Sequence, residues 1–231
     1  MAVAKVGSTG TKNDGTGTTH TLSYTLNGSA NFLLARIQWN EVGDTISSVT
    51  WDGGAMTAAG SVAADGDDHK CVIYYLASPA TGTRNLVVTF SGAVGGAFIG
   101  ADGYSGVDTT TPVSDYTTGI SVGSAASPAS ITIDSATDDL VVDLLGWAWN
   151  GATMTVGAGQ TEDVNLADTL FGGSHAGCSS EPGATSVTMS WTYTGNLNWA
   201  MAGLNIKAAS GGGGASSGPY RTTRNLRARA I

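Results

Sequence analysis

Apolar and polar residues alternate along almost the whole chain, and this two-residue period limits what it can fold into. In Val187–Tyr193 every second residue is apolar, without a fault. Successive side chains of a strand point to opposite faces, so such a run predicts a strand with one buried face. No segment keeps the 3.6-residue period of an amphipathic helix. We count about ten strands separated by Gly, Ser, Asn and Asp turns, which predicts an all-β sandwich.

The composition agrees with this fold class. Charged residues make up 12% of the 231 residues, about half the usual share, and Thr, Ser and Gly take their place. Two longer apolar runs, Phe32–Trp39 and Leu140–Trp149, are typical of strands that are buried on both faces.

A weak internal repeat relates the two halves of the chain. Thr19–Asn40 is similar to Ala129–Asn150, and Pro79–Val107 is similar to Pro182–Ile206. Two small sandwiches in tandem, or two halves interleaved in one jelly roll, would both produce this pattern, and so would chance similarity. We favour one jelly-roll-like β-sandwich with a weak internal duplication, because the apolar runs need cover on both faces. We interpret Asp108–Pro128, rich in Thr and Ser, as the linker between the halves.

The charge is divided unevenly between the body and the C-terminus. Residues 1–208 hold 6 basic and 18 acidic residues, a net charge of −12, and the last 11 residues hold four arginines, a charge of +4. We therefore divide the chain into an N-terminal arm (1–18), a β-sandwich domain (19–208), a Gly/Ser linker (209–219) and an extended basic C-terminal arm (220–231). The acidic body disfavours a nucleic-acid partner.

The C-terminal arm is the candidate binding site. Arg221, Arg224 and Arg227 are three residues apart, so a short helix would align them on one face. Arginine pairs well with carboxylates, and the body is acidic. We expect the arm to dock on another chain of an assembly through a set of aromatic, basic and apolar residues: Tyr220, Arg221, Arg224, Leu226, Arg227, Arg229 and Ile231.

Motifs for catalysis, cofactors or metals are weak. Asp65–His69 lacks the spacing of a calcium loop and is interpreted as a solvated hairpin tip. Ser105 lacks the second glycine and the following helix of a nucleophile elbow. Asp138 and Asp139 are adjacent in a turn and are interpreted as solvated. We predict no catalytic residue, no cofactor and no metal.

The cysteines and tryptophans fit a packed core. Cys71 and Cys178 are expected to be buried, reduced thiols, although pairing between them is left open. Most of the six tryptophans are expected in the core. A tryptophan platform for sugar binding is the alternative.

Several segments resemble β-sandwich domains of tailed-phage structural proteins and bacterial surface proteins. The resemblance covers about Thr19–Ala208 and is carried by turns and strands, namely Val49–Thr57, Ile73–Gly82, Tyr104–Pro112, Leu140–Asp143, Gly157–Thr161 and Trp199–Ala202. It implies a fold and no catalytic residues. The basic arm is not part of it.

The resemblance and the charge pattern together favour a structural virion component, such as a capsid decoration or a head- or tail-surface protein. Its partners would be other virion proteins or copies of itself. The N-terminus has no apolar signal-peptide core and the chain has no apolar membrane span, so we expect synthesis in a host cytoplasm and no membrane partner. The alternative is an extracellular carbohydrate-binding adhesion module of a phage fibre or bacterial surface protein. A concanavalin-like hydrolase is a weaker third class.

Overall fold

The computed structural model describes residues 1–40, 43–66, 69–148, 153–167 and 174–210. These residues form eighteen β-strands, and no helix occurs among them. All strand pairs are antiparallel. The all-β sandwich predicted from the alternation is confirmed.

The first half of the chain forms one sandwich of two sheets. Sheet I has the order β1 (Ala4–Asp14), β10 (Gly96–Ser105), β3 (Phe32–Asn40), β8 (His69–Ala77) and β6 (Thr57–Ala58), with β7 (Ala63–Ala64) also paired to β8. Sheet II has the order β2 (Gly17–Leu26), β9 (Gly82–Val94), β4 (Ile46–Trp51) and β5 (Gly54–Ala55).

The second half forms a second sandwich. Sheet III has the order β11 (Val113–Ala126), β18 (Asn196–Ile206), β13 (Leu140–Ala148), β16 (Ser174–Pro182) and β15 (Thr161–Ala167). Sheet IV has the order β12 (Ala129–Asp134), β17 (Ser186–Thr192) and β14 (Thr155–Val156).

The two sandwiches repeat the same strand order. β1, β10, β3 and β8 stand in sheet I as β11, β18, β13 and β16 stand in sheet III, and β2 pairs with β9 as β12 pairs with β17. This correspondence agrees with the internal duplication. In each half the first strand pairs with the last, as β1 does with β10 and β11 with β18. The second strand pairs with the last but one, as β2 does with β9 and β12 with β17.

The single interleaved jelly roll favoured from the sequence is not what the strand pairing shows. No named strand of one half pairs with a strand of the other among the described residues, and the β-bridge between them is the isolated one between Val107 and Ala208. The tandem alternative is the observed one. The supposed linker Asp108–Pro128 contains β11, an edge strand of sheet III.

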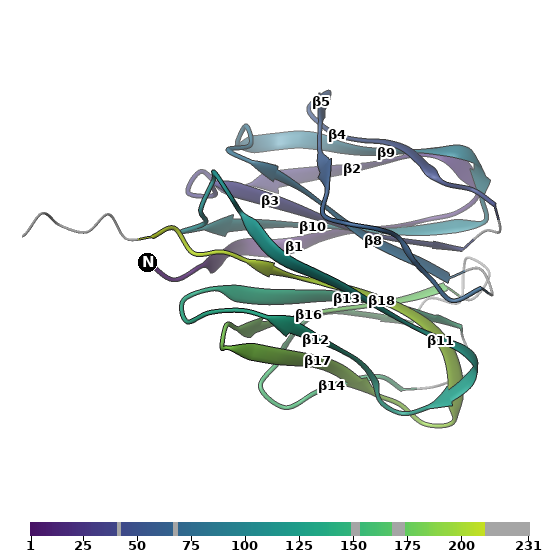
Figure 1. Cartoon of the computed structure of the whole chain (residues 1–231). Coiled ribbons are helices and arrows are strands. Elements are labelled where there is room, and N and C mark those ends of the chain that lie inside the picture. Colours follow the sequence, from purple (N-terminus) through teal and green to yellow (C-terminus); the bar gives the residue numbers. More distant parts are fainter. Residues whose placement is uncertain (41–42, 67–68, 149–152, 168–173, 211–231) are drawn as a thin grey trace, which may run out of the picture.

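The sandwiches stack through their larger sheets, so the molecule has four layers, II, I, III and IV (Figure 1). Three apolar cores lie between them: one inside each sandwich and one at the junction of sheets I and III. β3 contributes Leu33 and Ile37 to the first core and Phe32 and Leu34 to the junction. The second cover that the apolar runs require is therefore the other sandwich.

Residues 1–18 do not form an arm in this structure. Ala4–Asp14 is β1, paired along β10 from Ser105 to Ala97. The segment has few apolar side chains, because β1 lies at the edge of sheet I and a bulge between Val6 and Gly10 interrupts its register. Its hydrophobic alternation is correspondingly weak.

Candidate functional site: the ion network between the sandwiches

Three charged residues lie inside strands that are otherwise largely apolar. Arg36 in β3, Asp102 in β10 and Asp143 in β13 are each 0% exposed. Moving an unpaired charge out of water costs many kcal/mol, so buried charges are almost always paired or hydrogen-bonded. These residues therefore indicate buried networks of ion pairs and hydrogen bonds inside the fold.

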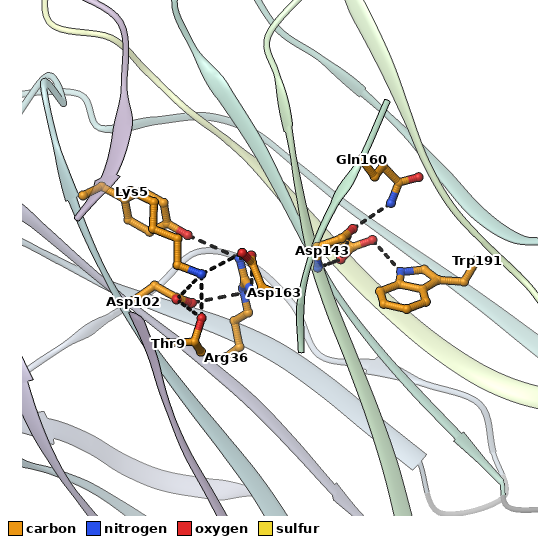
Figure 2. Close-up of polar contacts among 10 residues, drawn as sticks. Lys5, Thr9, Arg36, Asp102, Asp143, Gln160, Asp163 and Trp191 are labelled. Carbon is orange, nitrogen blue, oxygen red and sulfur yellow. Dashed lines mark hydrogen bonds and ion pairs between the residues drawn. The ribbon is translucent and has the colours of Figure 1, made fainter. Parts of the chain in front are cut away.

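Arg36 and Asp102 belong to a four-membered network that crosses the junction (Figure 2). Asp163 of β15 accepts from both terminal nitrogens of Arg36, Nη1 and Nη2, at 3.0 Å. Lys5 of β1 places its Nζ 2.6 Å from Asp163 and 3.0 Å from Asp102. Three members come from sheet I and Asp163 comes from sheet III, so the network ties the two sandwiches together.

Two neutral groups complete the network. The hydroxyl of Thr9 donates to Asp102 at 2.7 Å, and Nη2 of Arg36 donates to the hydroxyl of Tyr104 at 3.3 Å. The two cations balance the two carboxylates, so no net charge is buried.

The balance of charges fixes the ionisation states. Burial opposes ionisation of Asp163, but Arg36 and Lys5 outweigh it and hold the pKa of Asp163 below its ordinary value. Burial also opposes the charge of Arg36, yet Tyr104 and Asp102 keep its pKa above the ordinary value. Both groups are charged at neutral pH, and the attraction between them is strong because little water screens it.

Asp143 anchors a second polar cluster between sheets III and IV. Its Oδ1 accepts from the backbone N of Ser179 at 2.6 Å and from the Ser179 hydroxyl at 2.9 Å, and its Oδ2 accepts from Nε1 of Trp191 at 2.8 Å. The side-chain amide of Gln160 donates to the Ser179 hydroxyl at 2.7 Å (Figure 2). Its carbonyl oxygen accepts from the backbone N of Ser190 at 2.8 Å. Burial raises the pKa of Asp143 to about 6, against the three donors that favour the carboxylate.

The two cysteines are buried thiols of low expected reactivity. Cys71 and Cys178 are both free and buried, as expected from the sequence. Burial raises the pKa of Cys178 to about 12, although Arg36 lowers it, and burial raises the pKa of Cys71 well above its ordinary value. Because the thiolate is the nucleophile, these thiols suit packing in the junction.

The structure revises two interpretations of the acidic motifs. Asp65 and His69 are buried rather than solvated, and they close the β7–β8 turn through a 2.8 Å contact of the His69 ring with Asp65. Asp139 is part-buried and bonded rather than merely solvated: it accepts from Asn205 at 2.7 Å and from the backbone N of Ala208 at 2.8 Å. Both carboxylates serve local structure.

The remaining candidates also have structural surroundings. Ser105 ends β10 and donates to the Ala4 carbonyl at 3.5 Å. The core prediction for the tryptophans is confirmed for the five that the structure describes, and all are buried: Trp39, Trp51, Trp147, Trp191 and Trp199. The sugar-stacking alternative therefore has no exposed tryptophan among these five.

The predicted docking residues Tyr220, Arg221, Arg224, Leu226, Arg227, Arg229 and Ile231 lie outside the described residues. The structure does describe the point from which this segment departs. Ala209 donates its backbone N–H to the Gly106 carbonyl at 2.8 Å, and Val107 pairs with Ala208. The chain is thus held between the two sandwiches up to Ala209.

Sequence reasoning did not find the network, although a signal was present. Arg36 interrupts the apolar run Phe32–Trp39, and Asp143 interrupts Leu140–Trp149. A charge within a strand that is buried on both faces must have a partner. The identity of the partner depends on how the two sandwiches stack, which no local pattern encodes.

Comparison of the chain with protein-family models, with curated proteins and with solved structures finds no match. Within the described ranges, no group of three or more His, Cys, Asp or Glu residues could hold a metal ion. The same part of the chain contains no helix of the length and apolarity needed to cross a membrane.

Proposed function

We propose that this chain is a non-catalytic structural component of a tailed-phage virion, a capsid decoration or a head- or tail-surface protein. The double sandwich is the exposed body, and the basic C-terminal segment is the attachment arm. The protein would be made in the host cytoplasm and then bound to other virion proteins or to copies of itself. The resemblance of its turns and strands to phage and surface β-sandwiches supports the proposal.

The observation that carries the proposal is the root of the arm. The backbone N–H of Ala209 donates to the Gly106 carbonyl of the first sandwich, and the backbone N–H of Ala208 donates to the Asp139 carboxylate of the second. Four arginines then follow in the last 11 residues, beyond a Gly/Ser linker. A segment that leaves a firmly held point can be directed at a neighbouring acidic chain, and arginine forms bidentate pairs with carboxylates.

The interior of the body supports a structural role in a second way. The buried carboxylates Asp102, Asp143 and Asp163 are bonded to groups of the protein itself. A general acid or base needs to reach a substrate proton, whereas these groups stabilise the stacking of sheets.

The test is incorporation into particles. Tagged full-length chain and a chain lacking Tyr220–Ile231 are supplied during phage growth, and purified particles are probed for the tag. We expect deletion to reduce incorporation at least about tenfold, since several charge-assisted contacts are lost, and to leave the circular dichroism and unfolding midpoint of the body unchanged.

The matched control keeps the length of the arm and changes only its charge, by replacing Arg221, Arg224, Arg227 and Arg229 with Gln. Loss of incorporation in this variant assigns the attachment to the arginines. Full incorporation of the truncated chain would contradict docking through the arm. Absence of the full-length chain from particles would contradict the virion role itself.

A further inference from the structure

His20 is a buried histidine whose two ring nitrogens both have partners. It lies in β2, just after the corner that joins β1 of sheet I to β2 of sheet II, and is 2% exposed. Its Nδ1 lies 3.0 Å from Oδ2 of Asp14, and its Nε2 lies 3.1 Å from the carbonyl oxygen of Gly17. The ring therefore spans the corner from the last residue of β1 to the first residue of β2.

Both partners of the ring can only accept hydrogen bonds. A backbone carbonyl has no proton to donate. Burial opposes ionisation of Asp14, but the bonds from Lys12 and His20 outweigh it and hold the pKa of Asp14 below its ordinary value, so this group is a carboxylate at neutral pH. A neutral imidazole carries one ring proton and satisfies one acceptor, whereas the imidazolium carries two protons and satisfies both. The geometry thus matches the charged form of the ring.

The backbone at this corner is weakly held by strand pairing. β1 and β2 both lie at the edges of their sheets. A register shift between Gly17 and Thr19 also interrupts the pairing of β2 with β9. The ring fits closely into this bend, because it packs edge-on to Phe90 with the ring centroids 5.6 Å apart, and a Cβ at Gly17 would lie 3.2 Å from its Cε1. His20 thus supplies side-chain bonds where the backbone ladder is interrupted.

From these contacts we propose that His20 is a pH-sensitive clamp on the β1–β2 corner, closed while the imidazolium donates to both Asp14 and Gly17 and released when the ring loses a proton. Histidine is the side chain that ordinarily changes charge between about pH 5 and 8. Loss of one proton leaves a ring nitrogen facing an acceptor oxygen with no hydrogen between them, which is costly in a buried side chain. The corner then opens more often.

Among the described residues, the charged groups that face the ring come from β1. Lys12 places its Nζ 2.7 Å from the same oxygen of Asp14 and so opposes a second positive charge, but its side chain is 34% exposed and water screens it. The other strands packed against β2 are β9 and β10. β9 presents Phe90 to the ring and carries Arg84 opposite Tyr24, further along β2. Asp102 of β10 is paired within the ion network.

The experiment follows the ring and the corner in the same sample of the full chain. Long-range proton–nitrogen NMR spectra distinguish an imidazolium from a neutral ring, and the variant His20→Gln assigns the His20 signals. Amide hydrogen exchange, corrected for the intrinsic exchange rate at each pH, measures how often the corner opens. We expect the protection of the amides of residues 13–20 to fall at least about tenfold as the His20 ring loses its proton, since a hydrogen bond to a charged group is lost.

Two variants separate the clamp from general effects of pH. In His20→Gln the protection of the corner should be low at every pH, because the amide side chain does not titrate. His69→Gln, the same substitution at a buried histidine of β8, is the matched control and should leave the pH dependence of the corner unchanged. A His20 ring that stays neutral or stays charged from about pH 5 to 8, or a corner whose protection does not follow the ring, would overturn the clamp. The clamp is a property of the single chain, so its failure would leave the virion role intact.

Discussion

Asp163 is the residue through which the second sandwich joins the ion network of the first. It accepts from Arg36 at 3.0 Å and from Lys5 at 2.6 Å. In Asp163→Ala the buried guanidinium keeps only Asp102, 3.5 Å away, as a charged partner. We expect the free energy of unfolding in urea to fall by about 3–5 kcal/mol, the usual cost of an uncompensated buried charge.

An exposed ion pair provides the control for this prediction. Asp52 and Arg84 form a pair whose side chains are 48% and 37% exposed. Water screens such a pair, so Asp52→Ala should cost less than about 1 kcal/mol. Equal losses in the two variants would mean that the junction network contributes no more than a surface contact.

Asp143 should make stability depend on pH. Burial raises its pKa from 3.8 to about 6, so the folded state holds the proton more tightly than the unfolded chain. Its contribution is therefore complete below about pH 4 and is lost as the pH rises through about 6, by roughly 3 kcal/mol at 1.36 kcal/mol per pKa unit.

The comparison variant for this residue is Asp143→Asn, which cannot ionise. The unfolding free energy of the wild type minus that of the variant is measured in urea from pH 4 to 8. This value should decrease as the pH rises and become constant above about pH 7. If the wild type instead gained stability relative to the variant as the pH rises, the pKa of Asp143 would be lowered by folding rather than raised.

At the scale of elements, regular alternation was sufficient where a strand buries one face. The period of Val187–Tyr193 predicts β17, and the buried residues of β17 alternate as expected. The sequence does not indicate β1 and β11 as strands, because edge strands need few apolar side chains and so carry a weak pattern. Their pairing is determined by the long-range topology.

Close approach of sheets I and III requires a small residue on β13. A Cβ at Gly146 would lie 2.7 Å from Cγ of Gln38 and 3.0 Å from Sγ of Cys71, both in sheet I. Gly146→Ala should therefore destabilise the protein by about 1–3 kcal/mol through overpacking, measured as a lower urea midpoint.

Gly28→Ala is the matched substitution, since nothing lies within 4 Å of its Cβ position. It should change the midpoint little. If Gly146→Ala were equally neutral, the two sandwiches would not be packed as closely as described.

At the scale of the whole molecule, the sequence indicated the fold class, the repeat and the buried runs. It could not distinguish one interleaved sandwich from two stacked ones, because both cover Phe32–Asn40 and Leu140–Ala148 on two faces. In the structure Val142 and Leu144 face the junction core while Val141 and Leu145 face the second core. The partners of Arg36 follow from that stacking, so they could not be predicted either.

The stacked arrangement gives the proposed assembly protein a long body with its attachment segment rooted at one end of the junction. Val3 is bonded to the Asp138 carbonyl at 2.8 Å, so both ends of the described chain lie where the sandwiches meet (Figure 1). Attachment at this point would leave sheets II and IV exposed on opposite sides.

Electron microscopy of purified native particles tests whether the protein is a structural component of a virion. We expect repeated surface density that fits two stacked β-sandwiches, with the end at Ala209 facing a neighbouring chain. Particles whose surface proteins leave no density for this double sandwich would contradict it.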